Sequence, residues 1–232
     1  MFSICFVVVD ELAEPLKMKL SSTLRFVALT LVWCTSTLAI GSQQYEPMSA
    51  SVRAVLHTAV SDASAPTLSL FSTGDDALWL EEMSARLEKR IPDPKFRREL
   101  LITIHYEATR AGLDPQMVLG LIQVESNFRK YAVSRAGARG YMQIMPFWLN
   151  VLDRPDDNLF HLRTNLRFGC TILRHYIDIE KGDLFRALGR YNGSLGRAEY
   201  PNLVRKAWER DWMWESPARL ATTQEMPSES VQ

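Results

Sequence analysis

One carboxylate stands apart from the other acids of this chain in a way that suits acid catalysis. Glu125 ends an apolar helical pattern, and residues 126–152 contain no Asp or Glu. The same interval carries four cations: Arg129, Lys130, Arg135 and Arg139. A carboxyl group without acidic neighbours, followed by a basic loop that contains glycines, indicates a proton donor placed near an anionic ligand.

The helix that must position Glu125 is predicted from its cap and its apolar face. Asp114 suits an N-cap, and Pro115 suits the first helical position. Glu125 lies four residues after Leu121 and three after Ile122, so it projects from the same apolar face.

Burial on that face raises the pKa of the Glu125 carboxyl and favours its protonated form, whereas nearby cations lower the pKa. We expect burial to dominate if the cations face solvent. The alternative is a surface residue at a helix C-terminus, a position that the helix dipole makes unfavourable for an anion.

The loop after Glu125 contains Gly137 and Gly140, which permit tight turns near a ligand. For Ser126 and Ser134, a bracing role within the loop and a substrate contact are both open. Three apolar residues of this stretch, Met142, Ile144 and Met145, are expected in the core.

Three ordered blocks within residues 92–208 resemble the soluble lytic transglycosylase (SLT) family. The first block begins with Glu125-Ser126, continues through Phe128, Ala132, Ser134, Gly137-Ala138 and Gly140, and ends with Met142-Gln143-Ile144-Met145-Pro146. The second is Asn165-Leu166-Arg167-Phe168-Gly169, and the third is Tyr191-Asn192-Gly193. Two departures from the family pattern are Tyr141 in place of Leu, and Gly193-Ser194 in place of Ala-Gly.

The resemblance implies an all-α, lysozyme-like domain that cleaves the β-1,4 bond between N-acetylmuramic acid and N-acetylglucosamine in peptidoglycan. It implies that Glu125 acts first as acid and then as base, forming a 1,6-anhydro ring without water. It also implies that Gln143 and Met145 line the sugar groove and that Tyr191 reaches the acid or the sugar beside it. The substrate-binding residues expected from these blocks are Ser126, Ser134, Gln143, Met145, Tyr191 and Asn192.

Two other functions remain open. A goose-type lysozyme would hydrolyse the same bond and would need an acid to position water. The candidates for that acid are Asp153, Asp156 and Asp157, although their place beside prolines is typical of a turn. A module that binds the cell wall without turnover is the second alternative.

The N-terminal residues 1–41 are predicted to be a signal peptide. Lys19 and Arg25 precede the apolar run 26–40, which ends in a small-x-small cleavage pattern at residues 39–41. Acidic residues before Met18 suit a leader poorly, so translation is expected to start at Met18. The protein is then periplasmic, or membrane-anchored if the leader is not cleaved.

The remaining chain is expected to comprise a flexible linker at 42–74 with a weak helix near 49–60, the SLT domain at 75–214 and a disordered tail at 215–232. Within the domain, helices are predicted from residue 75 to before Pro92, and at 96–110, 115–125, 146–152, 164–180, 184–190 and 201–208. Tyr191 to Gly193 are expected just beyond the sixth of these.

Charge and cysteine content give no support to nucleic acid binding or to a metal site. Lys and Arg together number 27, and so do Asp and Glu, so net charge gives no argument for nucleic acid binding. No His or Cys cluster has metal-ligand spacing, and Cys170 is the one cysteine after the leader. No metal or cofactor is therefore expected, and the expected partner is the peptidoglycan glycan strand.

Overall fold

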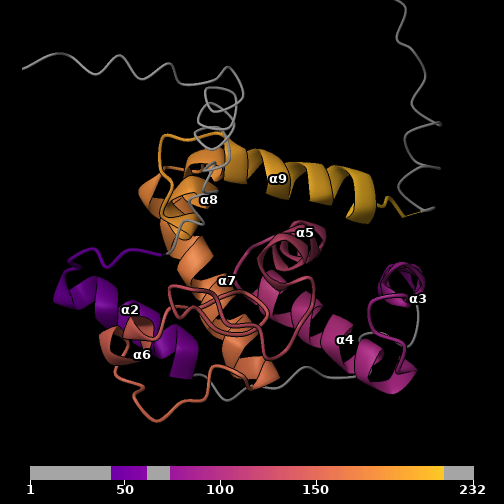
Figure 1. The fold of residues 1–232 in the computed structure, drawn as a ribbon, viewed down its shortest axis with the longest axis horizontal. Helices are drawn as coiled ribbons and strands as arrows, with labels where there is room; N and C mark the ends of the chain where they lie inside the picture. Colours follow the sequence, from indigo (N-terminus) through magenta and orange to yellow (C-terminus); the bar gives the residue numbers. More distant parts are fainter. Residues whose placement is uncertain (1–42, 62–73, 217–232) are drawn as a thin grey trace, which may run out of the picture. The chain divides into compact units, whose positions relative to one another are not determined.

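The computed structural model describes residues 43–61 and 74–216. Within these residues every regular element is helical, and the only β pairing is a pair of isolated bridges, Val133–Arg139 and Arg139–Ile144. The elements are α2 (Ala50–Ser61), α3 (Asp75–Leu87), α4 (Pro94–Arg110), α5 (Pro115–Ser126), α6 (Phe147–Val151), α7 (Leu162–Ile179), α8 (Leu184–Asn192), α9 (Glu199–Ala207) and a π-helical turn, η2 (Trp208–Trp212) (Figure 1). The expected all-α class is confirmed.

Aspartates begin three of these helices. The side chains of Asp93, Asp114 and Asp183 each accept a hydrogen bond from a backbone N–H two or three residues ahead, at the starts of α4, α5 and α8. Such caps satisfy N–H groups that have no partner inside the helix. The cap at Asp114 and the proline that follows it fix where α5 starts, as the sequence predicts.

Helices α5 and α7 form the centre of the core. Helix α5 packs against α4, α9 and η2, and α7 packs against α2, α4 and α8 (Figure 1). Burial extends over most of α5: the sequence from Met117 to Ile122 is inaccessible to solvent or nearly so. The helix that carries Glu125 is therefore a rigid support for a functional side chain, because other helices pack against it on several sides.

Part of the segment expected to be a linker, residues 42–74, is the helix that the sequence predicts near residues 49–60. Residues 50–61 form α2, which packs against α7, and Leu56 and Val60 are buried there. Two apolar residues at helical spacing outweigh the Ser- and Ala-rich composition on which the linker prediction relied. The rest of that segment, the leader and the tail from residue 217 lie outside the described residues.

The third sequence block also lies differently from its prediction. Tyr191 and Asn192 belong to the last turn of α8, and the left-handed backbone that ends this helix occurs at Gly193, with φ of 72°. The last helix begins at Glu199 rather than 201, which places Tyr200 inside its first turn. Pro201 is tolerated there because first-turn N–H groups have no helical acceptor.

A glycine lets the C-terminal elements approach α5 closely. A Cβ added at Gly120 would lie 2.8 Å from the backbone nitrogen of Trp208, where η2 begins. Backbone atoms cannot move aside as a flexible side chain can, so a larger residue would push η2 and α9 outward. Gly120 thus fixes how near α9 comes to the helix that carries Glu125.

We therefore expect Gly120→Ala to destabilise the fold by about 1–3 kcal/mol of overpacking, offset in part by the helix propensity of alanine, about 1 kcal/mol. Gly189→Ala in α8 is the matched control, because its nearest neighbour, the Leu195 Cα, is 3.3 Å away. Urea unfolding measures both variants. A Gly120→Ala protein as stable as Gly189→Ala would contradict the close approach of η2 to α5.

Candidate active site

Glu125 lies in the last turn of α5, partly buried, one residue before the end of the helix. Asn127 and Phe128 follow with φ of 48° and 62°, so the chain turns away from the helix axis immediately beyond the acid. This left-handed pair ends the helix and leaves the carboxyl group at the junction of α5 and the loop.

The electrostatics of Glu125 favour a proton donor. Burial raises the pKa of this carboxyl from 4.5 to about 7, and a hydrogen bond from Tyr200 opposes the rise. The loop cations contribute little to this balance, because Arg129, Arg135 and Arg139 have exposed side chains. A carboxyl with a pKa near neutrality can both give and take a proton at working pH.

Tyr200, from the first turn of α9, is the residue that touches the acid. Its hydroxyl donates a hydrogen bond to Glu125 Oε1, and its side chain is 8 % exposed. Burial, and then the charge of Glu125, raise the pKa of the Tyr200 phenol well above its ordinary value, so it stays a donor. Sequence reasoning missed this residue, since it lies outside the three blocks.

The Tyr191 hydroxyl hydrogen-bonds to the loop that follows Glu125 rather than to the acid itself. It donates to the Met142 carbonyl oxygen at 2.7 Å, and the Tyr191 side chain is buried. Burial, and then the charge of Glu125, raise the pKa of Tyr191, so the phenol lies within electrostatic range of the acid without a hydrogen bond to it. Its direct contact fixes the loop that follows Glu125.

The two serines brace the loop. The Ser126 hydroxyl is buried and donates to the carbonyl oxygens of Tyr141, at 2.8 Å, and Ile122. Ser134 is partly exposed, and its Oγ accepts from the Ala138 backbone N–H at 3.1 Å. Both serines therefore make the contacts expected of residues that brace the loop. A substrate contact by either stays a prediction.

Gln143 and Met145 lie on the returning part of the loop. The Gln143 Nε2 atom donates to the carbonyl oxygens of Gly140, at 2.9 Å, and Ala132. Met145 is partly buried, and Asn192 is partly buried at the end of α8. Met142 and Ile144 are fully buried, as expected of core residues.

Asn165 of α7 holds the loop to the core. Its Oδ1 accepts from the Met142 N–H at 2.8 Å, and its Nδ2 donates to the carbonyl oxygens of Arg139 and Leu159. The side chain is fully buried and all these polar groups are paired. Asn165, which belongs to the second sequence block, therefore fixes the loop of the first block by hydrogen bonds.

The acids considered for a hydrolase form a turn instead. Asp157 makes two hydrogen bonds of 2.9 Å with the Arg154 guanidinium, and Asp153 has a positive φ of 52°. Neither is among the causes of the Glu125 pKa shift, which are burial and Tyr200. Their geometry agrees with the turn reading.

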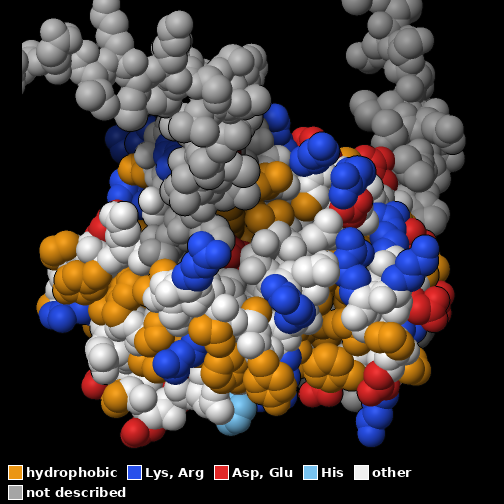
Figure 2. Space-filling model, viewed as in Figure 1, with side chains coloured by type: hydrophobic (Ala, Val, Ile, Leu, Met, Phe, Trp, Pro, Cys, Tyr) orange, Lys and Arg blue, Asp and Glu red, His pale blue; other side chains and the backbone are white. Residues whose placement is uncertain are grey.

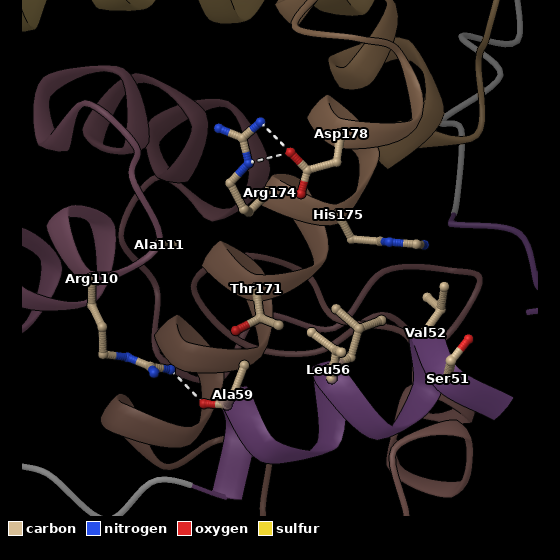
Figure 3. A pocket seen from close by; sticks show the side chains of 11 residues that line it. Ser51, Val52, Leu56, Ala59, Arg110, Ala111, Thr171, Arg174, His175 and Asp178 are labelled. Atoms are coloured by element: carbon tan, nitrogen blue, oxygen red, sulfur yellow. Dashed lines mark hydrogen bonds and ion pairs between the residues drawn. The ribbon is translucent and has the colours of Figure 1, made fainter. Parts of the chain in front are cut away.

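The described part of the chain contains no cluster of His, Cys, Asp or Glu that could hold a metal ion. No helix there is long and apolar enough to cross a bilayer. A hollow of about 470 Å³ lies between α2, the end of α4 and α7, away from Glu125, with the paired Arg174 and Asp178 at its edge (Figure 3).

Comparison with known proteins identifies the domain. The family model described as "Transglycosylase SLT domain" matches residues 102–210. A transglycosylase of Enterobacteria phage PRD1 is 33% identical over 98 residues, which cover 42% of this chain and 36% of the phage protein. The "Membrane-bound lytic murein transglycosylase C" of Actinobacillus pleuropneumoniae is 45% identical over 49 residues, which cover 21% of this chain and 13% of that protein.

The corresponding protein of Haemophilus influenzae has the same identity over 49 residues, 14% of its length. The chain thus spans about a third of the phage relative and a much smaller part of the bacterial ones. The matched residues include α5, the loop, α7, α8 and α9, which together build the surroundings of Glu125. Residues 102–210 of the chain therefore match the transglycosylase SLT domain family.

Proposed function

We propose that this protein is a peptidoglycan lytic transglycosylase in which Glu125 is the single catalytic acid and base. The observation that carries the proposal is the partly buried Glu125 carboxyl, whose pKa burial raises to about 7 while Tyr200 holds one of its oxygens. The SLT family match and the names of the relatives supply the substrate class.

The reaction needs one group that changes role. Protonated Glu125 gives its proton to the glycosidic oxygen as the bond from that oxygen to muramic acid C1 breaks. The acetamido oxygen of the same sugar stabilises the positive charge at C1. The Glu125 carboxylate then takes the proton from the C6 hydroxyl, whose oxygen bonds to C1 and closes the 1,6-anhydro ring.

An intramolecular hydroxyl suits this site better than a water molecule. Most glycosidases use two carboxylates, one of them to attack C1 or to activate water. Residues 126–152 supply no acid, and the carboxylates at 153–157 form a turn. The C6 hydroxyl is already held near C1 by the sugar ring, at high effective concentration, and needs no second acid to position it.

The substrate also fits the charge of the loop. In the face drawn in Figure 2, Lys and Arg side chains are spread across the surface between hydrophobic ones. Exposed Arg129, Arg135 and Arg139 follow Glu125 directly. Such cations attract the carboxylates of muramic acid peptides.

The site of action follows from the substrate. Murein lies in the cell envelope, and the bacterial relatives are named as membrane-bound. We therefore propose that the protein acts in the envelope, which residues 1–41 would allow as a leader. Those residues lie outside the described part, so a periplasmic location and a cleaved leader stay predictions.

The products test the function. Fragments released from purified sacculi should carry 1,6-anhydro-muramic acid ends, weigh one water less than hydrolysis products and resist borohydride reduction. Glu125→Gln is the control: it removes the transferable proton, so release should fall at least 10²-fold while the fold persists. Reducible ends would indicate a lysozyme, and binding without release by the wild-type protein would indicate a non-catalytic module.

Tyr200→Phe tests how the acid is positioned. Wild-type kcat/KM should fall as pH rises above about 7, because Glu125 loses its proton there. Tyr200 lowers that pKa, so its removal should move the falling limb to higher pH and reduce kcat about 10- to 100-fold, the value of a hydrogen bond to a charged group.

Tyr106→Phe on α4 is the matched tyrosine control. It should change neither kcat nor the pH at which kcat/KM begins to fall. A Tyr200→Phe profile that overlays that of the wild type would show that the hydroxyl does not act on Glu125.

A further inference from the structure

A short segment before α2 reaches the surroundings of the acid. We name residues 43–48 the strap; they lead into α2 at the indigo end of the ribbon (Figure 1). At its start, the Gln43 Oε1 atom accepts a hydrogen bond from the Met145 N–H at 3.2 Å. Gln43 is 5 % exposed, although its neighbour Gln44 is exposed, so its side chain points inward.

The strap joins two parts of the domain. Glu46 makes two hydrogen bonds, of 2.7 and 2.8 Å, with Nη1 of Arg190 in α8. The Tyr45 ring meets Phe147 edge-on, with 6.0 Å between centroids. The strap therefore spans from α8 to the residues that follow the catalytic loop, although Tyr45 and Glu46 are themselves exposed.

Tyr191 shows how near Gln43 lies to the acid. Burial and then the charge of Glu125 raise the pKa of the Tyr191 phenol. A side-chain hydrogen bond with Gln43 lowers that pKa. The same hydroxyl donates to Met142, three residues before the Met145 N–H that Gln43 occupies. Gln43 thus belongs to the polar environment that Glu125 also affects.

The chemistry of this contact is that of an N-acetyl group. A glutamine side chain ends in a carboxamide, the same group as the acetamido substituent of both sugars in peptidoglycan. Its carbonyl oxygen accepts the Met145 backbone N–H beside the loop, and its side chain also interacts with the Tyr191 phenol. A secondary acetamide, which carries a methyl group where glutamine carries its chain, offers the same acceptor to Met145.

The strap is also weakly held. Glu46 is exposed, and Arg190 keeps a second carboxylate partner in Glu180, so the Glu46–Arg190 pair contributes little to holding the strap. A segment with few buried contacts opens more readily than the packed core. The Gln43 side chain can therefore leave Met145 without unfolding the domain.

We propose that the Gln43 carboxamide is an internal stand-in for a substrate N-acetyl group, and that the strap must release Met145 before a sugar can bind there. This inference rests on the proposed function, because it takes an N-acetylated glycan as the ligand. The strap is then an intramolecular competitor: the apparent Kd for the glycan is the intrinsic Kd divided by the fraction of molecules in which the strap has released Met145.

Binding of a β-1,4-linked N-acetylglucosamine tetramer tests the proposal. The titration is made on the Glu125→Gln protein, so that turnover does not interfere. Adding Gln43→Ala should tighten binding roughly two- to tenfold, the net effect of one hydrogen bond lost by the competitor. Gln44→Ala, at the exposed neighbour, is the matched control and should leave the Kd unchanged.

Two further arms separate competition from a general structural effect. The de-N-acetylated tetramer should not gain from Gln43→Ala, since it has no acetamido group to replace the carboxamide. Glu46→Gln, which loosens the strap at Arg190 and keeps Gln43, should also tighten binding of the acetylated tetramer, though less.

Unchanged or weaker binding by Gln43→Ala, or an equal gain for both oligomers, would overturn the proposal. Such an outcome together with anhydro products from the wild-type protein would leave the proposed function intact. Loss of those products would reject the function itself.

Discussion

The proposed chemistry depends on a partly buried carboxyl group that accepts a hydrogen bond from one phenol. Glu125 sits at the end of α5, where burial raises its pKa to about 7, and Tyr200 donates to its Oε1 atom. The two effects oppose each other, and burial is the larger one. Without burial the carboxyl would be ionised at neutral pH. Without the phenol it would lose the hydrogen bond that orients its Oε1 atom. A single acid that must first give and then take a proton needs this balance.

The rest of the domain serves that arrangement. Gly120 lets η2 approach the α5 backbone, and this brings α9 and Tyr200 to the acid. On the other side, Asn165 of α7 pairs with three backbone groups around the loop that follows Glu125. Tyr191 adds a fourth tie to the same loop, at Met142. The acid is therefore positioned by rigid helices, while the loop beside it is fixed by buried hydrogen bonds from those helices.

The sequence predicts what depends on neighbours along the chain. The cap at Asp114, the apolar face of α5 and the direction of the Glu125 pKa shift all follow from residues within one helix. Tyr200 is different: it lies 75 positions from Glu125, and only the packing of α9 on α5 brings the two together. Likewise, nothing in the Ser- and Ala-rich composition near Gln43 predicts its contact with Met145, 102 positions away. The family resemblance gives the blocks but not these pairings.

The most direct test of this account is the ionisation of Glu125 itself. A protein with ¹³C-labelled glutamate carboxyl groups can be titrated by NMR, with the Glu125 signal assigned from its absence in Glu125→Gln. The account predicts a midpoint near pH 7 for this carbon. A Glu125 midpoint near 4.5 would contradict it, because the group would then be ionised, and could not act as an acid, at the pH where the protein is proposed to work.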